Sequence, residues 1–385
     1  MKSIQIPLNN LEKRTFIFFL IPVLLLFFSP GLLAQKSTVV TEAGAVKVKT
    51  LAENLDHPWG MAFLPDGRLL VTERAGTLRI LEKDSVLTEP LQGTPEVFAK
   101  GQGGMLDVAL DPNFEENNYI YLSYSEPGDN GTAGTALGRG KLENGSISDF
   151  EVVFRMEPKV EGPNHFGGRI VFIDDNHLYL TLAERFKFDP AQDLSNHLGT
   201  VVRIHPDGTI PQDNPFVGDE NAQDAIWSYG HRNIESAAID PDTGTFWVAE
   251  MGPMGGDELN RPEAGKNYGW PVVSWGDNYD GTKIPDPDTR PEFADAVIVW
   301  TPTISPSGMI FYTGDHFKEW QGDMFIGGLT STGLVRVQVD GEKAEEVERI
   351  PLNLRIRDVE QAPDGSIYVL TDEDNGKVMR LKHLE

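Results

Sequence analysis

The chain of 385 residues contains no cysteine. No disulfide can hold the fold, which has to rest on its own hydrophobic core, and a zinc site built from thiolates is excluded. An anchor of the lipoprotein type, which needs a cysteine, is excluded as well. The hydrophobic share of 39% and the charged share of 24% are ordinary for a globular protein, so we do not expect disorder over most of the length.

Basic residues are few compared with acidic ones. Lysine and arginine number 33 against 59 aspartates and glutamates, and the formal net charge is −26. A surface of this charge repels nucleic acid and anionic lipid. We therefore expect neutral substrates, cations or basic protein partners, and no nucleic-acid partner.

The chain has a single long apolar run, "FIFFLIPVLLLFF", at residues 16–28. The run is shorter than the roughly 20 residues that cross a bilayer, it is interrupted by Pro22, and basic residues precede it. These features favour a secretory signal over a retained membrane anchor. We predict a signal peptide at residues 1–34, one domain at residues 35–385 with no stable membrane insertion after cleavage, and a periplasmic or secreted bacterial protein.

Long helical periodicity is also nearly absent, and another pattern recurs: a turn rich in Asp, Pro and Gly, a short alternating strand, then Thr or Glu. Its six copies lie at residues 64–74, 110–126, 173–185, 239–252, 312–328 and 362–374. Their irregular spacing fits blades with unequal loops better than a solenoid of identical turns. We predict an all-β fold, a six-bladed β-propeller with four-stranded antiparallel blades. Residues 45–53 would close the ring by pairing with residues 376–382.

One histidine stands between glycines directly ahead of a predicted strand, His165 in "GPNHFGGRI". An imidazole at this position can cap a backbone group, hold a metal, or take a proton from a substrate. Gln102 in "GQGGMLD" also lies among glycines. Its amide could meet a planar ligand that the backbone approaches closely, or it could be a solvated turn residue.

Two segments present arginines that could grip carboxylates. Arg232 and Asn233 follow a glycine in "SYGHRNIES", and Arg355 and Arg357 stand at strand spacing in "LRIRDVE". Residues two apart on a strand leave the same face, and a guanidinium binds a carboxylate through two hydrogen bonds. The alternative for the second pair is a surface charge that balances the neighbouring acids.

The segment "EMGPMGGDELN", residues 250–260, has no room for a regular element before Asp257. Its glycines and proline free the carbonyls of Gly252 and Pro253 from strand pairing. Carbonyl and carboxylate oxygens suit calcium better than zinc. The alternative is a turn whose acids cap nearby backbone groups.

Taken together, the motifs identify a family. They are "DHPWGMAFLPDGRLLVTERAGTLRI", "GQGGMLDVALDPNF", "HFGGR", "AQDLSNHLGTVVRIHPDGTIPQDNPF", "YGHRN", "GPMGGDELN", "GKNYGWPVVSWGDNYDG", "PSGMIFYTGD" and "RIRDVEQAPDGSIYVLTD". From about residue 50 to the C-terminus, in matching order, the chain resembles the soluble aldose sugar dehydrogenases that use pyrroloquinoline quinone. The resemblance implies a six-bladed propeller that oxidises the anomeric hydroxyl of aldoses to lactones, with the quinone and Ca²⁺ as cofactors. It also implies an external electron acceptor, for which a basic cytochrome would suit the acidic surface.

The resemblance assigns roles to individual residues. His165 would be the general base, and the carbonyls of Gly252 and Pro253 would bind the calcium that touches the quinone. The implied cofactor contacts are Gln102, Arg232, Asn233, Thr330, Arg355 and Arg357. A further calcium site would involve Glu258, Tyr268 and Tyr279.

The chain departs from the family pattern at three places. Thr330 stands where relatives commonly have a basic residue, residues 234–236 replace Pro-Gln-Gly, and Met251 and Met254 replace polar or basic residues. A lost charge-assisted contact costs about 1.5–3 kcal/mol, so each could weaken cofactor binding roughly tenfold to a hundredfold. Two alternatives to the enzyme stay open: a calcium-stabilised propeller that binds carbohydrate or protein without redox activity, and a hydrolase such as a lactonase.

Overall fold

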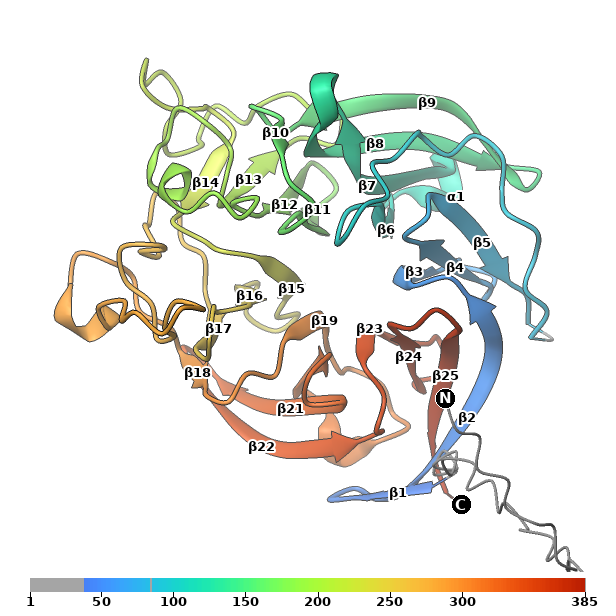
Figure 1. Ribbon diagram of the computed structural model, residues 1–385. Helices are drawn as coiled ribbons and strands as arrows, with labels where there is room; N and C mark the ends of the chain where they lie inside the picture. The colour runs from blue at the N-terminus through green and yellow to red at the C-terminus, as the bar shows by residue number, and fades with distance from the viewer. Residues whose placement is uncertain (1–37, 84, 385) are drawn as a thin grey trace, which may run out of the picture. The chain divides into compact units, whose positions relative to one another are not determined.

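The computed structural model describes residues 38–83 and 85–384, which belong to one compact unit, Lys36–Glu385. The predicted signal peptide at residues 1–34 lies outside the described residues. Six antiparallel sheets stand as blades around a common centre (Figure 1). The prediction of an all-β six-bladed propeller is confirmed.

The blades follow the order of the chain; in the first five the first strand is the innermost, and in the sixth the innermost strand is β23 (Ile356–Gln361). The first blade consists of β3 (Pro58–Phe63), β4 (Leu69–Glu73) and β5 (Thr77–Leu81). The second consists of β6 (Met105–Leu110), β7 (Tyr119–Pro127), β8 (Thr132–Glu143), β9 (Ser146–Arg155) and β10 (Val160–Glu161). The third consists of β11 (Gly167–Asp174), β12 (His177–Leu182), β13 (Thr200–Ile204) and β14 (Ile226–Tyr229). The fourth consists of β15 (Ile234–Ile239), β16 (Phe246–Glu250), β17 (Asp257–Asn260) and β18 (Ile298–Trp300). The fifth consists of β19 (Pro306–Phe311), β20 (Met324–Gly328), β21 (Gly333–Asp340) and β22 (Lys343–Pro351).

The sixth blade contains strands from both ends of the described chain. It consists of β1 (Thr38–Thr41), β2 (Gly44–Leu55), β23 (Ile356–Gln361), β24 (Ile367–Thr371) and β25 (Gly376–His383). Strand β2 pairs antiparallel with β25, from Val46 opposite His383 to Leu55 opposite Gly376. The predicted closure of the ring is confirmed, and hydrogen bonds make it without a disulfide.

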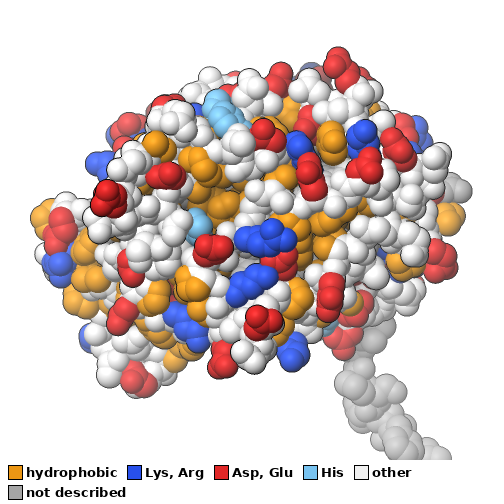
Figure 2. Space-filling view, turned by 90° about the horizontal axis from the view of Figure 1, so that it is seen from above, with side chains coloured by type: hydrophobic (Ala, Val, Ile, Leu, Met, Phe, Trp, Pro, Cys, Tyr) orange, Lys and Arg blue, Asp and Glu red, His pale blue; other side chains and the backbone are white. Residues whose placement is uncertain are grey.

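Helix is limited, among the described residues, to five short segments. They are α1 (Phe114–Asn117) and the 3-10 turns Asp129–Gly131, Asp189–Gln192, Pro287–Thr289 and Lys318–Trp320. None of the described helices is long and apolar enough to span a membrane. Figure 2 shows acidic side chains spread over the visible face, with basic side chains singly or in small groups among them, as the net charge of −26 leads one to expect.

Each copy of the sequence repeat forms the turn between the first two strands of a blade and the second strand itself. In the first copy Gly67 takes a φ of 86°, which a residue without a side chain adopts at little cost, and its N–H donates to the carbonyl of Leu64 at 2.8 Å. The strand that follows is buried along its whole length. The same order of turn and buried strand recurs in the other blades, although short helical segments lengthen the connection in the second blade (Phe114–Asn117) and in the fifth (Lys318–Trp320).

The innermost strands β3, β6, β11, β15, β19 and β23 contact one another in sequence and close a ring. Arg169 of β11 crosses the centre of this ring, where its guanidinium lies 3.2 Å from a carboxylate oxygen of Asp107 on β6 and 2.9 Å from one of Asp358 on β23. It also donates to the carbonyl of Glu235 on β15 at 2.8 Å. One buried side chain thus ties four blades together directly below the site.

Candidate functional site

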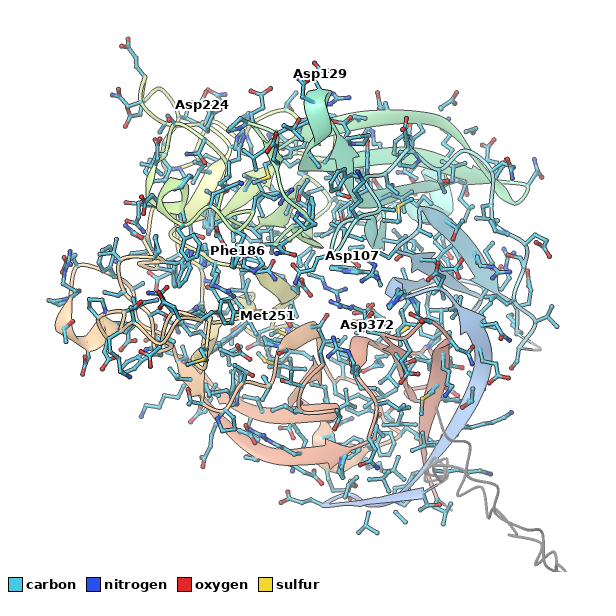
Figure 3. The ribbon with its side chains drawn as sticks, viewed as in Figure 1. Asp107, Asp129, Phe186, Asp224, Met251 and Asp372 are labelled. Atoms are coloured by element: carbon cyan, nitrogen blue, oxygen red, sulfur yellow. The ribbon has the colours of Figure 1, made fainter. Side chains whose placement is uncertain are left out.

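The predicted site residues gather where the innermost strands begin. His165 precedes β11, Arg232 and Asn233 precede β15, and Arg355 precedes β23, of which Arg357 is the second residue. Figure 3 labels Phe186, Met251 and Asp372 around this central region. Because the first strands surround the centre, residues far apart in sequence meet at their starting ends.

A chain of hydrogen bonds connects four of the predicted residues. The side-chain oxygen of Gln102 accepts from the backbone N–H of His165 at 2.7 Å, and that of Asn233 accepts from the N–H of Gly167 at 3.3 Å. The amide nitrogen of Asn233 donates to Glu235 at 3.1 Å, and the other carboxylate oxygen of Glu235 accepts from Arg357. The structure brings Gln102, His165, Asn233 and Arg357 into one network.

The surroundings of His165 fix the proton on its ring. Nδ1 lies 2.6 Å from Oε1 of Glu184, a carboxylate with no exposed surface. The other oxygen of Glu184 accepts from the backbone N–H groups of Lys187 and Phe188, so the carboxylate acts as an acceptor throughout. Nδ1 therefore carries the proton and Nε2 keeps its lone pair. Burial lowers the pKa of His165 below its usual value, although Glu184 opposes the shift.

Arg232 is a buried cation that no carboxylate among the described residues pairs with. It is 3% exposed; Nη1 donates to the carbonyls of Met251 and Gly252, both at 2.8 Å, and Nη2 donates to the hydroxyl of Tyr279 at 3.2 Å. Its Nε has no hydrogen-bond partner. A desolvated guanidinium without a counter-ion is costly, and an anionic ligand would supply the missing charge.

The two remaining arginines share one acid. Nη2 of Arg355 lies 3.2 Å and Nη2 of Arg357 lies 2.8 Å from the same oxygen of Asp372. Burial alone would raise the pKa of Asp372, but the charge of Arg357 and the hydrogen bonds hold it below its ordinary value. Arg357 is buried and also paired with Glu235, whereas 46% of the Arg355 side chain is exposed. Arg355 is the one of the two that is free to meet a ligand.

Thr330 lies beside Arg355 but presents no charge. Its hydroxyl donates to the carbonyl of Thr303 at 3.0 Å and lies 3.1 Å from the hydroxyl of Ser305, from which it can accept, while the preceding carbonyl, of Leu329, accepts from Arg355 at 3.4 Å. The threonine is exposed. A basic side chain at this position would add a second cation near Arg355.

The loop with the predicted calcium carbonyls is held by an acid. Asp257 accepts from the N–H of Gly252 at 2.9 Å and from the N–H of Ser305 at 2.6 Å, and burial raises its pKa to about 6. For Asp257 the capping alternative is therefore the one that the structure adopts. No described residue donates to the carbonyl of Pro253, whereas that of Gly252 accepts from Arg232. Of the two predicted calcium carbonyls, that of Pro253 is therefore open to a cation, and that of Gly252 is occupied by Arg232.

The residues proposed for a further calcium site separate into two places. Glu258 and Tyr268 line a cavity of about 20 Å³ together with Glu250 and Gly252, which is room for about one water molecule or ion. Burial and the charge of Glu250 raise the pKa of Glu258 to about 8, and a cation there would relieve this repulsion. The hydroxyl of Tyr268 already binds the carbonyl of Arg261 and the N–H of Glu263, so it is engaged by its own loop. Tyr279 is not among the lining residues; it is 61% exposed and bonds to Arg232.

No group of three or more His, Cys, Asp or Glu side chains within residues 38–83 and 85–384 is arranged to hold a metal by itself. A calcium site in this part of the chain would have to use backbone carbonyls and the ligand, as the predicted set does.

Sequence reasoning missed Glu184, Glu235 and Asp372, the acids that orient the predicted residues. A signal for Glu184 was present. It stands 19 residues after His165, and Glu250 stands 19 residues after His231. In both blades an acid binds Nδ1 of a histidine ahead of the first strand, at 2.6 Å and 2.9 Å; Glu250 is the last residue of the second strand of its blade, and Glu184 lies two residues beyond that of its own. The Thr or Glu at the end of the sequence repeat includes Glu184 and Glu250, but the repeat gives no information on which residues they bind.

The chain is similar to known sugar dehydrogenases over nearly its whole length. The model of the family described as glucose/sorbosone dehydrogenase matches residues 55–380. Aldose sugar dehydrogenase YliI of Escherichia coli is 44% identical over 364 residues, which cover 92% of this chain and 98% of that protein.

Solved structures give the same result. The apo crystal structure of the soluble aldose sugar dehydrogenase of Escherichia coli matches with a TM-score of 0.84 at 44% identity, covering 88% of this chain and 99% of that one. The structure of aldose sugar dehydrogenase from Streptomyces coelicolor with pyrroloquinoline quinone bound matches with a TM-score of 0.72 at 28% identity, covering 88% and 98%. The chain therefore belongs to the glucose/sorbosone dehydrogenase family.

Proposed function

We propose that the protein is a quinoprotein that oxidises the anomeric hydroxyl of aldose sugars to lactones. The observation that carries this proposal is the His165 pair with Glu184 beside Arg232, a buried cation without a counter-ion. A base with a free lone pair and a site that lacks an anion together suit proton abstraction next to an anionic cofactor. The family relation supports the same reaction.

In this reaction Nε2 of His165 takes the proton of the anomeric hydroxyl while the hydride leaves the same carbon. Glu184 keeps the ring proton on Nδ1 and stabilises the imidazolium that forms. Burial of the ring favours its neutral form before the sugar arrives. When bound, pyrroloquinoline quinone would accept the hydride, and Ca²⁺ would polarise its reactive carbonyl.

The cofactor would be held by residues that already share the site. Arg232 and Arg355 offer cations to its carboxylates, and Gln102, Asn233 and Thr330 offer polar groups; Arg357 would act from below through Asp372. The carbonyls of Gly252 and Pro253 would bind the calcium next to the cofactor. A second calcium would occupy the cavity at Glu258 and Tyr268, and Tyr279 would contact the cofactor side of Arg232 instead.

Exposed apolar side chains beside the site support a neutral sugar as the substrate. Phe186, Met254 and Tyr279 are 38%, 52% and 61% exposed, and the rings of Phe186 and Tyr279 are 6.4 Å apart. Figure 3 places Phe186 next to the central region. Aromatic faces of this kind pack against the C–H groups of a pyranose ring.

The proposal extends to export and to the electron acceptor. The signal at residues 1–34 would deliver the domain at residues 35–385 to the periplasm or the exterior, and the net charge of −26 would favour a basic acceptor such as a cytochrome. Sequencing the N-terminus of the protein recovered from a periplasmic fraction would test the first point.

Purified protein loaded with Ca²⁺ and pyrroloquinoline quinone should reduce a dye when glucose or another aldose is added. His165→Gln should lower kcat by about 10²- to 10⁴-fold and leave the cofactor-induced thermal shift intact. His177→Gln is the matched control, since His177 lies in the same blade but away from the predicted site residues, where it contacts Asp174 and the ring of His205. Absence of both turnover and a quinone-dependent shift in the wild type would refute the proposal.

A second candidate is a propeller that binds calcium and carbohydrate or protein without redox activity. The neutral Thr330 and the pairing of both Arg355 and Arg357 with Asp372 favour it, because they leave little positive charge for a tricarboxylate. Retention of calcium with no measurable affinity for the quinone would decide in its favour.

A further inference from the structure

Arg185 is a buried cation that the proposed reaction does not use. The residue has no exposed surface, and no carboxylate within the described part of the chain forms an ion pair with it. Burial lowers its pKa to about 10, against the opposing charge of Glu184, so the guanidinium is charged at neutral pH. A charge placed here without an acid partner calls for a specific reason.

The contacts of Arg185 bracket His165. Nη1 donates to the carbonyl of Asn164 at 2.5 Å and Nη2 to the carbonyl of Gly162 at 2.6 Å. The guanidinium also lies 3.7 Å from the centre of the Phe166 ring. One planar group therefore holds the residue before and the residue after His165.

The neighbours of Arg185 act on the imidazole itself. Glu184 binds Nδ1 at 2.6 Å, and Phe186 packs edge-on against the ring, with centroids 5.0 Å apart and an interplanar angle of 83°. Three consecutive residues, Glu184 to Phe186, thus contact the loop that carries His165. The backbone is strained on both sides of this contact: φ is 57° at Arg185, 59° at Phe186 and 52° at His165. Residues with side chains occupy this region only where the surroundings fix them.

We propose that Arg185 is a positioning residue for His165, which holds the backbone on both sides of the ring so that Nε2 keeps one direction toward the sugar. It does not touch the substrate, and its role rests on the proposed function of His165 as the base. A lysine cannot replace it, because one ammonium group can neither bind two carbonyls in a fixed fork nor stack on Phe166 in the same way.

The kinetic test compares Arg185→Lys and Arg185→Met with Arg336→Lys. Arg336 is the matched control: it is 3% exposed, and its partners Asp323, Glu348 and Glu42 are not among the predicted site residues or their contacts. Both Arg185 variants should lose at least tenfold in kcat, with KM for the sugar and quinone affinity within threefold of wild type. Arg336→Lys should lose thermal stability but keep its kcat. The proposal fails if kcat of the Arg185 variants stays within threefold, or if it falls only in proportion to stability.

A second readout does not depend on turnover. The Cε1–H NMR signal of His165, assigned by its loss in His165→Gln, should be single in the wild type and become shifted, broadened or split in both Arg185 variants, while Arg336→Lys leaves it in place. An unchanged signal in the Arg185 variants overturns the inference. If the wild type shows no quinone-dependent turnover but the signal responds as expected, the proposed function fails and the positioning role stands.

Discussion

At the scale of single residues, Glu184 decides which nitrogen of His165 is available. Its carboxylate accepts three hydrogen bonds, one from the ring and two from backbone N–H groups. Since a carboxylate only accepts hydrogen bonds, the nitrogen of His165 that faces Glu184 has to carry the ring proton. That nitrogen is Nδ1. The proposed role of His165 as the base therefore depends on this acid as much as on the histidine.

Glu184→Gln should lower kcat by about 10²- to 10⁴-fold. The amide oxygen will keep the two backbone N–H groups, so the NH₂ group will face Nδ1 and drive the ring proton to Nε2. Since Glu184 raises the pKa of His165, its loss should also move the acid limb of the kcat/KM profile to lower pH. In the wild type that limb should lie below pH 6.5, with activity lost as the pH falls through the lowered pKa. Steady-state kinetics across pH checks both points, and a kcat within threefold of wild type would contradict the tautomer argument.

Thr330→Lys should tighten the binding of pyrroloquinoline quinone. A charge-assisted hydrogen bond contributes about 1.5–3 kcal/mol, which corresponds to roughly a tenfold to hundredfold lower Kd. Titration calorimetry of the apo-protein measures this directly. Val40 in β1 is 82% exposed and lies outside the site, so Val40→Lys serves as a control for the added positive charge. An unchanged affinity would mean that the bound cofactor does not approach residue 330.

At the scale of elements, the loop between β16 and β17 carries the predicted calcium carbonyls in a tight backbone arrangement. A side chain at Gly252 would meet the carbonyl oxygens of Gly255 and Gly256, both at 2.3 Å. The loop is fixed to the next blade through the bond from Ser305 to Asp257. Its carbonyls are therefore aimed by packing of backbone against backbone and by one buried acid.

Gly252→Ala should displace the carbonyls of Gly252 and Pro253 and weaken calcium binding by at least tenfold, with loss of quinone-dependent activity. Calcium titration followed by thermal shift measures the effect. Gly134→Ala is the control, because the closest atom to its added Cβ would be the flexible side chain of Lys159 at 3.1 Å. Normal calcium dependence in Gly252→Ala would remove this loop from the metal site.

At the scale of the whole molecule, stability depends on the closure of the ring. Strand β2 comes before the first blade but pairs with β25 in the last, so the two ends of the propeller are joined by backbone hydrogen bonds and a shared core. The chain has no disulfide to assist them. Loss of packing at this point should affect every blade, because each is held only by its neighbours.

Val46→Ala in β2 should lower the free energy of unfolding by about 2 kcal/mol, because it removes two buried methyl groups. Val46 is fully buried, whereas Val40 in the neighbouring β1 is 82% exposed. Thermal unfolding of Val46→Ala and Val40→Ala compares the two positions. Equal effects would show that closure through β2 does not limit stability.

The local pattern of the sequence was sufficient for the architecture. Each copy of the repeat predicts a turn followed by a buried strand, and both depend on about ten neighbouring residues. The same holds for the single histidine among glycines and for the arginines at strand spacing. Six copies of a blade, with a strand left over at the start and a partner for it at the end, leave a closed propeller as the arrangement that buries every sheet.

Only the tertiary structure decided which charges neutralise one another. Arg357 meets Glu235 across 122 residues, Asp372 serves two arginines at once, and Arg232 is left with carbonyls and a tyrosine. Such pairings depend on where the six strand ends meet in space, and a charge carries no local mark of its partner. The sequence by itself therefore determined the propeller and the family, while the folded arrangement decided that Glu184 pairs with Nδ1 of His165, that Arg185 binds carbonyls of the same loop and that Arg232 has no carboxylate partner among the described residues.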